Sequence, residues 1–172
     1  MTYILSQAAA ALSTVILLVY SVMKVKRNVI LLCNVAINLL LTAHYALLQN
    51  STGAACSLVT TIMVVAFYDK SRLGKNLRWF VFVFFVLLFI LCGVFTWEDG
   101  WSAIPVVGNI LLTVALRNDN ENTIKGLFIV IGILWIILNI HLKSVTNTVG
   151  QVLAVSSNIL YFLRIRKSRA SG

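Results

Sequence analysis

Seven long apolar runs alternate with short segments that hold most of the charged residues of this chain. A helix of about 20 apolar residues crosses the roughly 30 Å hydrocarbon layer of a bilayer and satisfies its backbone polar groups internally. The pattern therefore predicts seven transmembrane helices. The expected spans cover residues 4–22, 28–48, 52–68, 79–96, 101–116, 126–142 and 145–163.

The composition indicates the same class of protein. Of the 172 residues, 60% are hydrophobic and 11% are charged, and the mean hydropathy is +0.95. Soluble domains carry about 25% charged residues, more than twice this fraction. We therefore expect an all-α integral membrane protein that is surrounded by the lipid bilayer and has little chain left for a soluble domain.

The net charge of +9 is distributed unevenly about the predicted membrane spans. Cytoplasmic loops are enriched in Lys and Arg, so the basic residues predict an outside N-terminus and a cytoplasmic C-terminus. The orientation of the chain during membrane insertion thus explains the surplus of basic residues, and contact with anionic lipids is the alternative explanation. No nucleic-acid partner is expected. The opposite side carries only Lys143 among the basic residues, with Glu98 and Asp99. The residues on the basic side are Lys24, Lys26, Arg27, Lys70, Arg72, Lys75, Arg78, Arg117, Lys125, Arg164, Arg166, Lys167 and Arg169.

The chain also matches itself at a constant offset of 97 residues, with eight identities between residues 28–72 and 125–169. A shared frame of this kind predicts an internal duplication. Three helices reverse the chain direction, so one added span lets the second copy run parallel to the first. We expect a 3+1+3 arrangement: residues 1–72, a linker helix within 73–100, and residues 101–172. The matched pairs are Leu41/Leu138, His44/His141, Asn50/Asn147, Gly53/Gly150, Ile62/Ile159, and Lys70-Ser71-Arg72 with Lys167-Ser168-Arg169.

The linker span is rich in phenylalanine and has few polar atoms, which is typical of a helix that faces lipid. Its phenylalanines are Phe80, Phe82, Phe84, Phe85, Phe89 and Phe95. Cys33, Cys56 and Cys92 lie inside apolar spans. We expect them to pack as small side chains, so no disulfide, metal site or cofactor is predicted.

Three segments carry a family resemblance: 105–116 beginning Pro-Val-Val-Gly, 135–141 from Trp to His, and 150–164 containing Asn-Ile-Leu. In the first copy, Gln7, the run 44–48 and Gly53-Ala54 look similar. On these motifs the chain resembles the YgjV-like bacterial inner-membrane proteins, within the SWEET, PQ-loop and PnuC-type transporters. The resemblance implies a bacterial inner membrane location and two three-helix bundles around a central path. It also implies a solute pocket lined by both copies and gating by rocking of the bundles.

Polar side chains at mid-membrane depth normally face the interior of a helical bundle and are candidates for this pocket. In SWEET-type proteins Asn and Trp near the pseudo-twofold axis contact the solute, and Trp135 and Asn158 match that pattern best. The same polar groups also serve as interhelical hydrogen-bond partners, worth on the order of 0.6 kcal/mol each. The substrate-binding candidates are Asn38, Thr61, Asn109, Trp135 and Asn158. The secondary candidates are Asn34, Thr60, Thr113, Asn139 and Ser157.

His44 and His141 fall near the outer ends of two repeat-related helices. They suggest an external gate or a pH sensor, with hydrogen-bonded interface histidines as the alternative. Pro105 near the start of the fifth span suggests a bend that acts as a hinge. These three residues are therefore candidates for gating rather than for contact with solute.

The five acidic residues all fall in connecting segments, which argues against a buried carboxylate proton relay. No convergent nucleophile, base or metal-ligand set is present, so an enzyme is not expected. We predict facilitated diffusion of a small neutral or zwitterionic solute by alternating access. A non-catalytic scaffold or regulatory subunit is the alternative, and a metal enzyme using His44 and His141 is less favoured because zinc usually takes at least three protein ligands. Assembly into a homo-oligomer is compatible with this arrangement. The acidic residues are Asp69, Glu98, Asp99, Asp119 and Glu121.

Overall fold

The computed structural model describes residues 1–22, 27–66, 75–118 and 120–170. Within these ranges the chain is helical and contains no strand. Its elements are α1 (Thr2–Val22), α2 (Arg27–Leu47), α3 (Ser51–Ala66), α4 (Lys75–Phe95), the 3₁₀ turn η1 (Gly100–Ser102), α5 (Ala103–Arg117), α6 (Glu121–His141) and α7 (Val145–Ala170). The seven helices coincide with the seven predicted spans, which confirms the all-α class.

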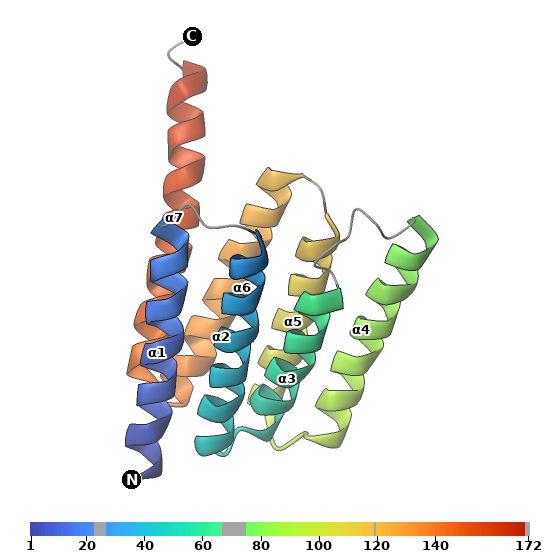
Figure 1. The fold of residues 1–172 in the computed structure, drawn as a ribbon, viewed down its shortest axis with the longest axis vertical. Coiled ribbons are helices and arrows are strands. Elements are labelled where there is room, and N and C mark those ends of the chain that lie inside the picture. Colours follow the sequence, from blue (N-terminus) through green and yellow to red (C-terminus); the bar gives the residue numbers. More distant parts are fainter. Residues whose placement is uncertain (23–26, 67–74, 119, 171–172) are drawn as a thin grey trace.

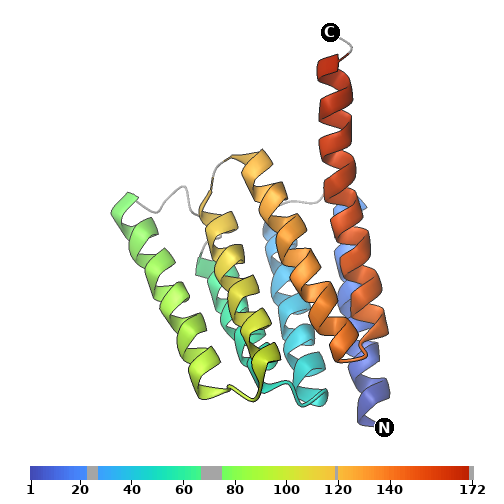
Figure 2. The same cartoon turned by 180° about the vertical axis from the view of Figure 1, so that it is seen from behind.

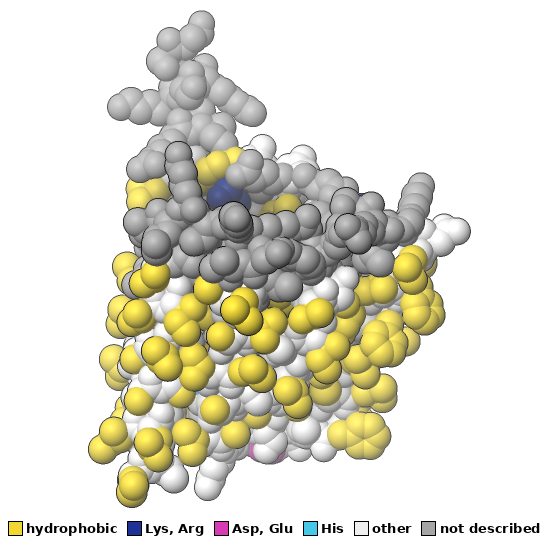
Figure 3. Space-filling view, viewed as in Figure 1, with side chains coloured by type: hydrophobic (Ala, Val, Ile, Leu, Met, Phe, Trp, Pro, Cys, Tyr) yellow, Lys and Arg dark blue, Asp and Glu magenta, His cyan; other side chains and the backbone are white. Residues whose placement is uncertain are grey.

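Within the described residues, three stretches are long and apolar enough to cross a membrane: Asn76–Phe95, Gly100–Arg117 and Asn122–His141. Shorter apolar helices cover Thr2–Leu17, Leu32–Leu47 and Ser51–Ala66. Hydrophobic side chains spread over the flank of the described helices in Figure 3, as expected for a surface in contact with lipid tails. That all seven helices span the bilayer stays a prediction.

Two helix boundaries differ from the predicted ones by several residues. Helix α7 continues to Ala170, seven residues past the predicted end, because Arg, Lys and Ala extend a helix well after its apolar run has stopped. Helix α6 starts at Glu121 rather than at residue 126. Its first turn is held by Asn120, whose side chain accepts hydrogen bonds from the backbone N–H groups of Asn122 and Thr123. A hydropathy pattern reveals neither the cap at the start of α6 nor the basic extension of α7.

In Figure 1 the helices α1 to α3 lie in front of α5 to α7, and α4 stands at one edge beside both sets (Figures 1 and 2). Successive contacts close a ring of six helices in the order α1, α2, α3, α5, α6 and α7, and α4 packs outside on α3 and α5. The α1–α3 half therefore meets the α5–α7 half along two seams, α1 against α7 and α3 against α5. The division at residues 72 and 100 into two repeats and a linker stays a prediction.

Helix α4 is only partly the lipid-facing helix that its phenylalanines predicted. Phe80 and Phe95 are exposed, at 65% and 81% of their surface. Phe85 and Phe89 instead are buried together with Cys56 and Met63 of α3 and form the apolar core of this end of the ring. The prediction was wrong for this face because α4 lies over the α3–α5 seam and must fill it.

The α2–α3 and α6–α7 turns share one conformation, and both lie at the end of the bundle that holds the N-terminus (Figure 1). Gln49 and Lys143 have positive φ values of 58° and 54°. The N–H that follows each of them donates to the carbonyl five residues earlier, from Asn50 to Tyr45 and from Ser144 to Asn139. This is the left-handed C-terminal cap of a helix. We call this end of the bundle the hairpin end.

These equivalent residues lie 94 positions apart, whereas the identities in the sequence lie 97 apart. In the frame of the turns, His44 corresponds to buried Leu138 rather than to His141. The matched histidines are therefore not structural counterparts, and their repetition does not indicate a symmetric gate.

Candidate functional site

The α1–α7 seam is joined by polar contacts near the hairpin end. The Tyr3 hydroxyl donates to the Lys143 carbonyl over 2.9 Å. The Gln7 side-chain carbonyl accepts from the Thr146 N–H, 3.2 Å away in the first turn of α7. That N–H has no partner within its own helix, so Gln7 of the other half supplies one.

His44 of α2 is fully buried between the two halves. Its Nδ1 lies 2.9 Å from both the hydroxyl and the carbonyl oxygen of Ser6 on α1, and its Nε2 lies 3.0 Å from the hydroxyl of Ser144. A carbonyl only accepts hydrogen bonds, so Nδ1 carries the proton and the Nε2 of the neutral ring accepts from Ser144. His44 thus links α1 and α2 to the residue that precedes α7.

Tyr45 makes a second set of contacts across the ring. Its hydroxyl donates to Asn139 Oδ1 of α6 over 3.3 Å. Asn147 Nδ2 of α7 donates to the Tyr45 hydroxyl and to Asn139 Oδ1, both over 3.1 Å. The Tyr45 ring also stacks on Trp135, with 5.7 Å between ring centroids. We call the buried residues Ser6, His44, Tyr45, Asn139, Ser144 and Asn147 the hairpin-end cluster.

The α3–α5 seam contains a smaller polar network. The Thr60 hydroxyl donates to Asn109 Oδ1 over 2.6 Å, which joins the two halves directly. Asn109 Nδ2 donates to the carbonyl of Pro105, and Thr113 donates to the carbonyl of Asn109. Thr60, Asn109 and Thr113 are buried. Three residues singled out in the sequence therefore meet here.

The remaining mid-membrane candidates take no part in either network. The side chains of Asn38, Thr61 and Asn158 donate to carbonyls four residues earlier in their own helices. Asn34 supplies the carbonyl for Asn38, and Ser157 is exposed. The common pocket of Asn38, Asn109, Trp135 and Asn158 stays a prediction; Asn38 and Asn158 show how a short side chain in a helix can return to its own backbone.

His141 and Pro105 have local roles in the structure. His141 is exposed and stacks on Trp101 with 4.1 Å between ring centroids. Pro105 lies in the first turn of α5, where its missing N–H removes no hydrogen bond within the helix. Its role as a hinge stays a prediction. Among the described residues no group of three or more His, Cys, Asp or Glu side chains could hold a metal, and both ring nitrogens of His44 are bonded to serines.

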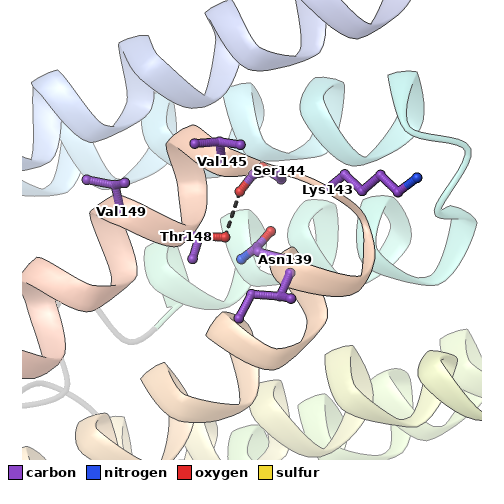
Figure 4. Close-up of a pocket in the computed structure, with 7 residues that line it drawn as sticks. Asn139, Lys143, Ser144, Val145, Thr148 and Val149 are labelled. Atoms are coloured by element: carbon purple, nitrogen blue, oxygen red, sulfur yellow. Dashed lines mark hydrogen bonds between the residues drawn. The ribbon is translucent and has the colours of Figure 1, made fainter.

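A cavity of about 370 Å³ borders the α6–α7 turn (Figure 4). Its polar lining includes Asn139, Ser144 and Thr148, and the Thr148 hydroxyl donates to the Ser144 carbonyl. Ile140 and Val145, also in its lining, are 62% and 66% exposed. All lining residues belong to the α6–α7 hairpin, so this groove lies beside the seams rather than within them.

Sequence reasoning missed most of the hairpin-end cluster. Ser6, Tyr45, Ser144 and Asn147 were not among the candidates, although Asn147 has an identical partner, Asn50, in the repeat frame. The two asparagines behave differently. Asn50 caps α3 by accepting from the Gly53 N–H, whereas Asn147 already lies inside α7 and reaches Tyr45. The match between Asn50 and Asn147 in the sequence drew attention to both residues, but where the following helix begins decides what each side chain does.

Comparisons with known proteins identify the family. Neither the curated proteins nor the solved structures contain a match to this chain. The family model of the Imp-YgjV proteins, described as bacterial inner membrane protein, matches residues 4–169. That range includes all seven helices except their outermost residues. The chain therefore belongs to the Imp-YgjV family of bacterial inner membrane proteins.

Proposed function

We propose that this protein is a facilitator that carries a small neutral or zwitterionic solute across the bacterial inner membrane. The α1–α3 and α5–α7 halves rock against each other as in the SWEET-type 3+1+3 transporters, and the pathway runs between them. The basic connections support an outside N-terminus and a cytoplasmic C-terminus. The hairpin end is then the outer end, and the hairpin-end cluster closes it.

One observation carries this proposal: buried polar side chains join the two halves, Thr60 with Asn109 at the α3–α5 seam and Tyr45 with Asn147 across the ring, whereas the flank is apolar. Two halves that never separate would be held well by apolar packing and small residues. Polar partners have a different use at a seam that opens, because each group can exchange its protein partner for water or solute. Individual bonds of this kind contribute on the order of 0.6 kcal/mol, so breaking several of them has a modest cost.

The chemistry of the seams indicates the solute class. The buried polar groups described along them are hydroxyls, carboxamides and one imidazole. Glu98 and Asp99 lie exposed at the hairpin end, and Lys143 is exposed in the α6–α7 turn. A path lined in this way offers hydrogen bonds without a fixed charge, which suits a solute with no net charge.

A non-catalytic scaffold is the second candidate, and the Thr60–Asn109–Thr113 network favours it. These three side chains are hydrogen-bonded to one another or to nearby backbone. A permanent helix contact would look the same in a static structure. The two functions differ in whether the seam must open, and that difference is measurable.

Cross-linking the α3–α5 seam is expected to stop uptake. In a variant without the native cysteines, Thr60→Cys with Asn109→Cys places two thiols where side chains now lie 2.6 Å apart. Oxidation then joins the halves and prevents rocking. We would measure uptake of labelled sugars, nucleosides, vitamins and amino acids into proteoliposomes before and after oxidation, and again after dithiothreitol, which should restore it.

The matched control is Thr52→Cys with Thr96→Cys, whose hydroxyl oxygens lie 3.0 Å apart. This pair joins α3 to the residue that follows α4 and crosses no seam, so oxidation should leave uptake unchanged. Uptake that continues through the oxidised Thr60/Asn109 pair would rule out rocking at this seam. A lack of uptake with every solute class would support the scaffold.

A further inference from the structure

A second, smaller cavity lies inside the ring, between α1, α2 and α7. Its volume is about 30 Å³, close to the space that one water molecule occupies in the liquid. Ser13 and Thr14 of α1 and Asn147 and Gln151 of α7 line it. The cavity thus joins polar side chains of both halves at the α1–α7 seam.

The cavity lies well inside the bundle. Thr14 is 12 residues after the first residue of α1, or about 18 Å along the helix axis, and Gln151 is six residues, or about 9 Å, into α7. With the starts of α1 and α7 near the outer surface of the roughly 30 Å hydrocarbon layer, as in the proposed topology, these residues lie toward its middle. Solute sites in transporters built from repeats lie at this depth, at the interface of the repeats.

The lining groups have hydrogen-bonding capacity to spare. The hydroxyls of Ser13 and Thr14 both donate to the Ala10 carbonyl, which leaves their oxygens as acceptors. Asn147 uses its Nδ2 for Tyr45 and Asn139, which leaves its Oδ1 as an acceptor. Among the described residues, the Gln151 side chain has no hydrogen-bond partner. The site therefore offers mainly acceptors, and it suits a ligand that presents O–H or N–H donors.

The lining also includes the apolar side chains of Leu17 and Ile37, so a ligand edge without polar atoms would be accommodated beside them. Gly150 sets the width of the cavity, because an added Cβ would lie 2.8 Å from the Thr14 hydroxyl oxygen. Helices α1 and α7 approach closely at this glycine. A small parting of the seam enlarges the cavity, whereas the present contact keeps it near the size of one water molecule.

We propose that the α1/α2/α7 cavity is the closed form of the solute site, and that it binds a neutral compound through its O–H or N–H donors. This rests on the proposed transport function and deepens it. Gln151 and Asn147 are the side chains that would select the solute. They replace the candidate set that the sequence suggested, which is Asn38, Thr61, Asn109, Trp135 and Asn158.

The test labels the full-length protein in proteoliposomes, in a background without native cysteines. Gln151→Cys is treated with 2-aminoethyl methanethiosulfonate, and the labelling rate is compared without and with acetamide or acetate. Acetamide and acetate have nearly the same shape, but only acetamide carries N–H donors. We expect acetamide at about nine times its dissociation constant to slow labelling by about tenfold, since only the empty site reacts, while acetate leaves the rate unchanged.

Val152→Cys is the matched control. Val152 is the next residue after Gln151, but its side chain is 45% exposed on the surface that we expect to face lipid. A thiol surrounded by lipid does not ionise, so it should remain unlabelled. Ser13→Cys is a second variant from the opposite wall and should behave as Gln151→Cys does, which protects the test against one misfolded variant.

Two results would overturn the site. One is that both cavity thiols resist labelling, and the other is that acetate protects them as well as acetamide does. Uptake by the wild-type protein is measured separately, so solute uptake with inaccessible cavity thiols would retain the transporter and discard this site. Labelling and protection without uptake would retain a binding site and discard transport.

Discussion

Replacing His44 by alanine is expected to lower the free energy of unfolding by about 2–4 kcal/mol, through a cavity and the loss of two buried hydrogen bonds. His44 is fully buried, and its ring nitrogens bond Ser6 of α1 and Ser144 beside α7. Alanine leaves both hydroxyls without this partner. The measurement is equilibrium unfolding of micellar protein by sodium dodecyl sulfate, followed by circular dichroism.

His141→Ala is the control, because this histidine matches His44 in the sequence yet is exposed and only stacks on Trp101. Its loss should cost less than about 1 kcal/mol. Equal effects of the two substitutions would contradict the assignment of His44 to the seam, and would return the histidines to the symmetric roles that the repeat suggested.

Gly132→Ala is expected to destabilise the protein by about 1–3 kcal/mol, because a methyl group there has no space. An added Cβ would lie 2.3 Å from Cγ2 of Val155, so α6 and α7 would be pushed apart. Small residues at such crossings let membrane helices approach closely. The same unfolding titration measures the change.

Val155→Ala removes the atom that clashes, so the Gly132→Ala/Val155→Ala double variant should be more stable than the sum of the two single effects predicts. Gly126→Ala provides a control on the same helix. No atom lies within 4 Å of a Cβ added there, and alanine in a helix is favoured over glycine by about 0.5–1 kcal/mol. Additive effects of Gly132→Ala and Val155→Ala would contradict the close crossing.

Much of the fold could be predicted from hydropathy alone. All seven helices were found because lipid and core both require apolar faces along about five turns, a signal that needs no knowledge of neighbours. The ends were less well predicted, as Asn120 at the start of α6 and the basic end of α7 show. Helix caps and propensities determine those positions.

The candidate site was predicted only in part. Thr60, Asn109 and Thr113 lie in a seam, as expected of polar residues within spans. Asn139 belongs to the hairpin-end cluster, and Trp135 stacks on Tyr45 of that cluster. The side chains of Asn38 and Asn158 instead bond their own helices. Depth in the membrane can be counted along a chain, but the direction of a side chain around a helix depends on which helices surround it.

The sequence by itself determined the membrane class, the helices and the one-sided basic connections, because each depends on the local number and spacing of apolar and charged residues. Only the tertiary structure decided which polar side chains contact one another. Helix α7 begins at Val145, so Asn147 crosses to Tyr45 whereas Asn50 caps α3, and the turns align His44 with Leu138 rather than with His141. A shift of three residues, from 97 to 94, turns a helix by about 300°, and it is this rotation that selects which polar groups meet.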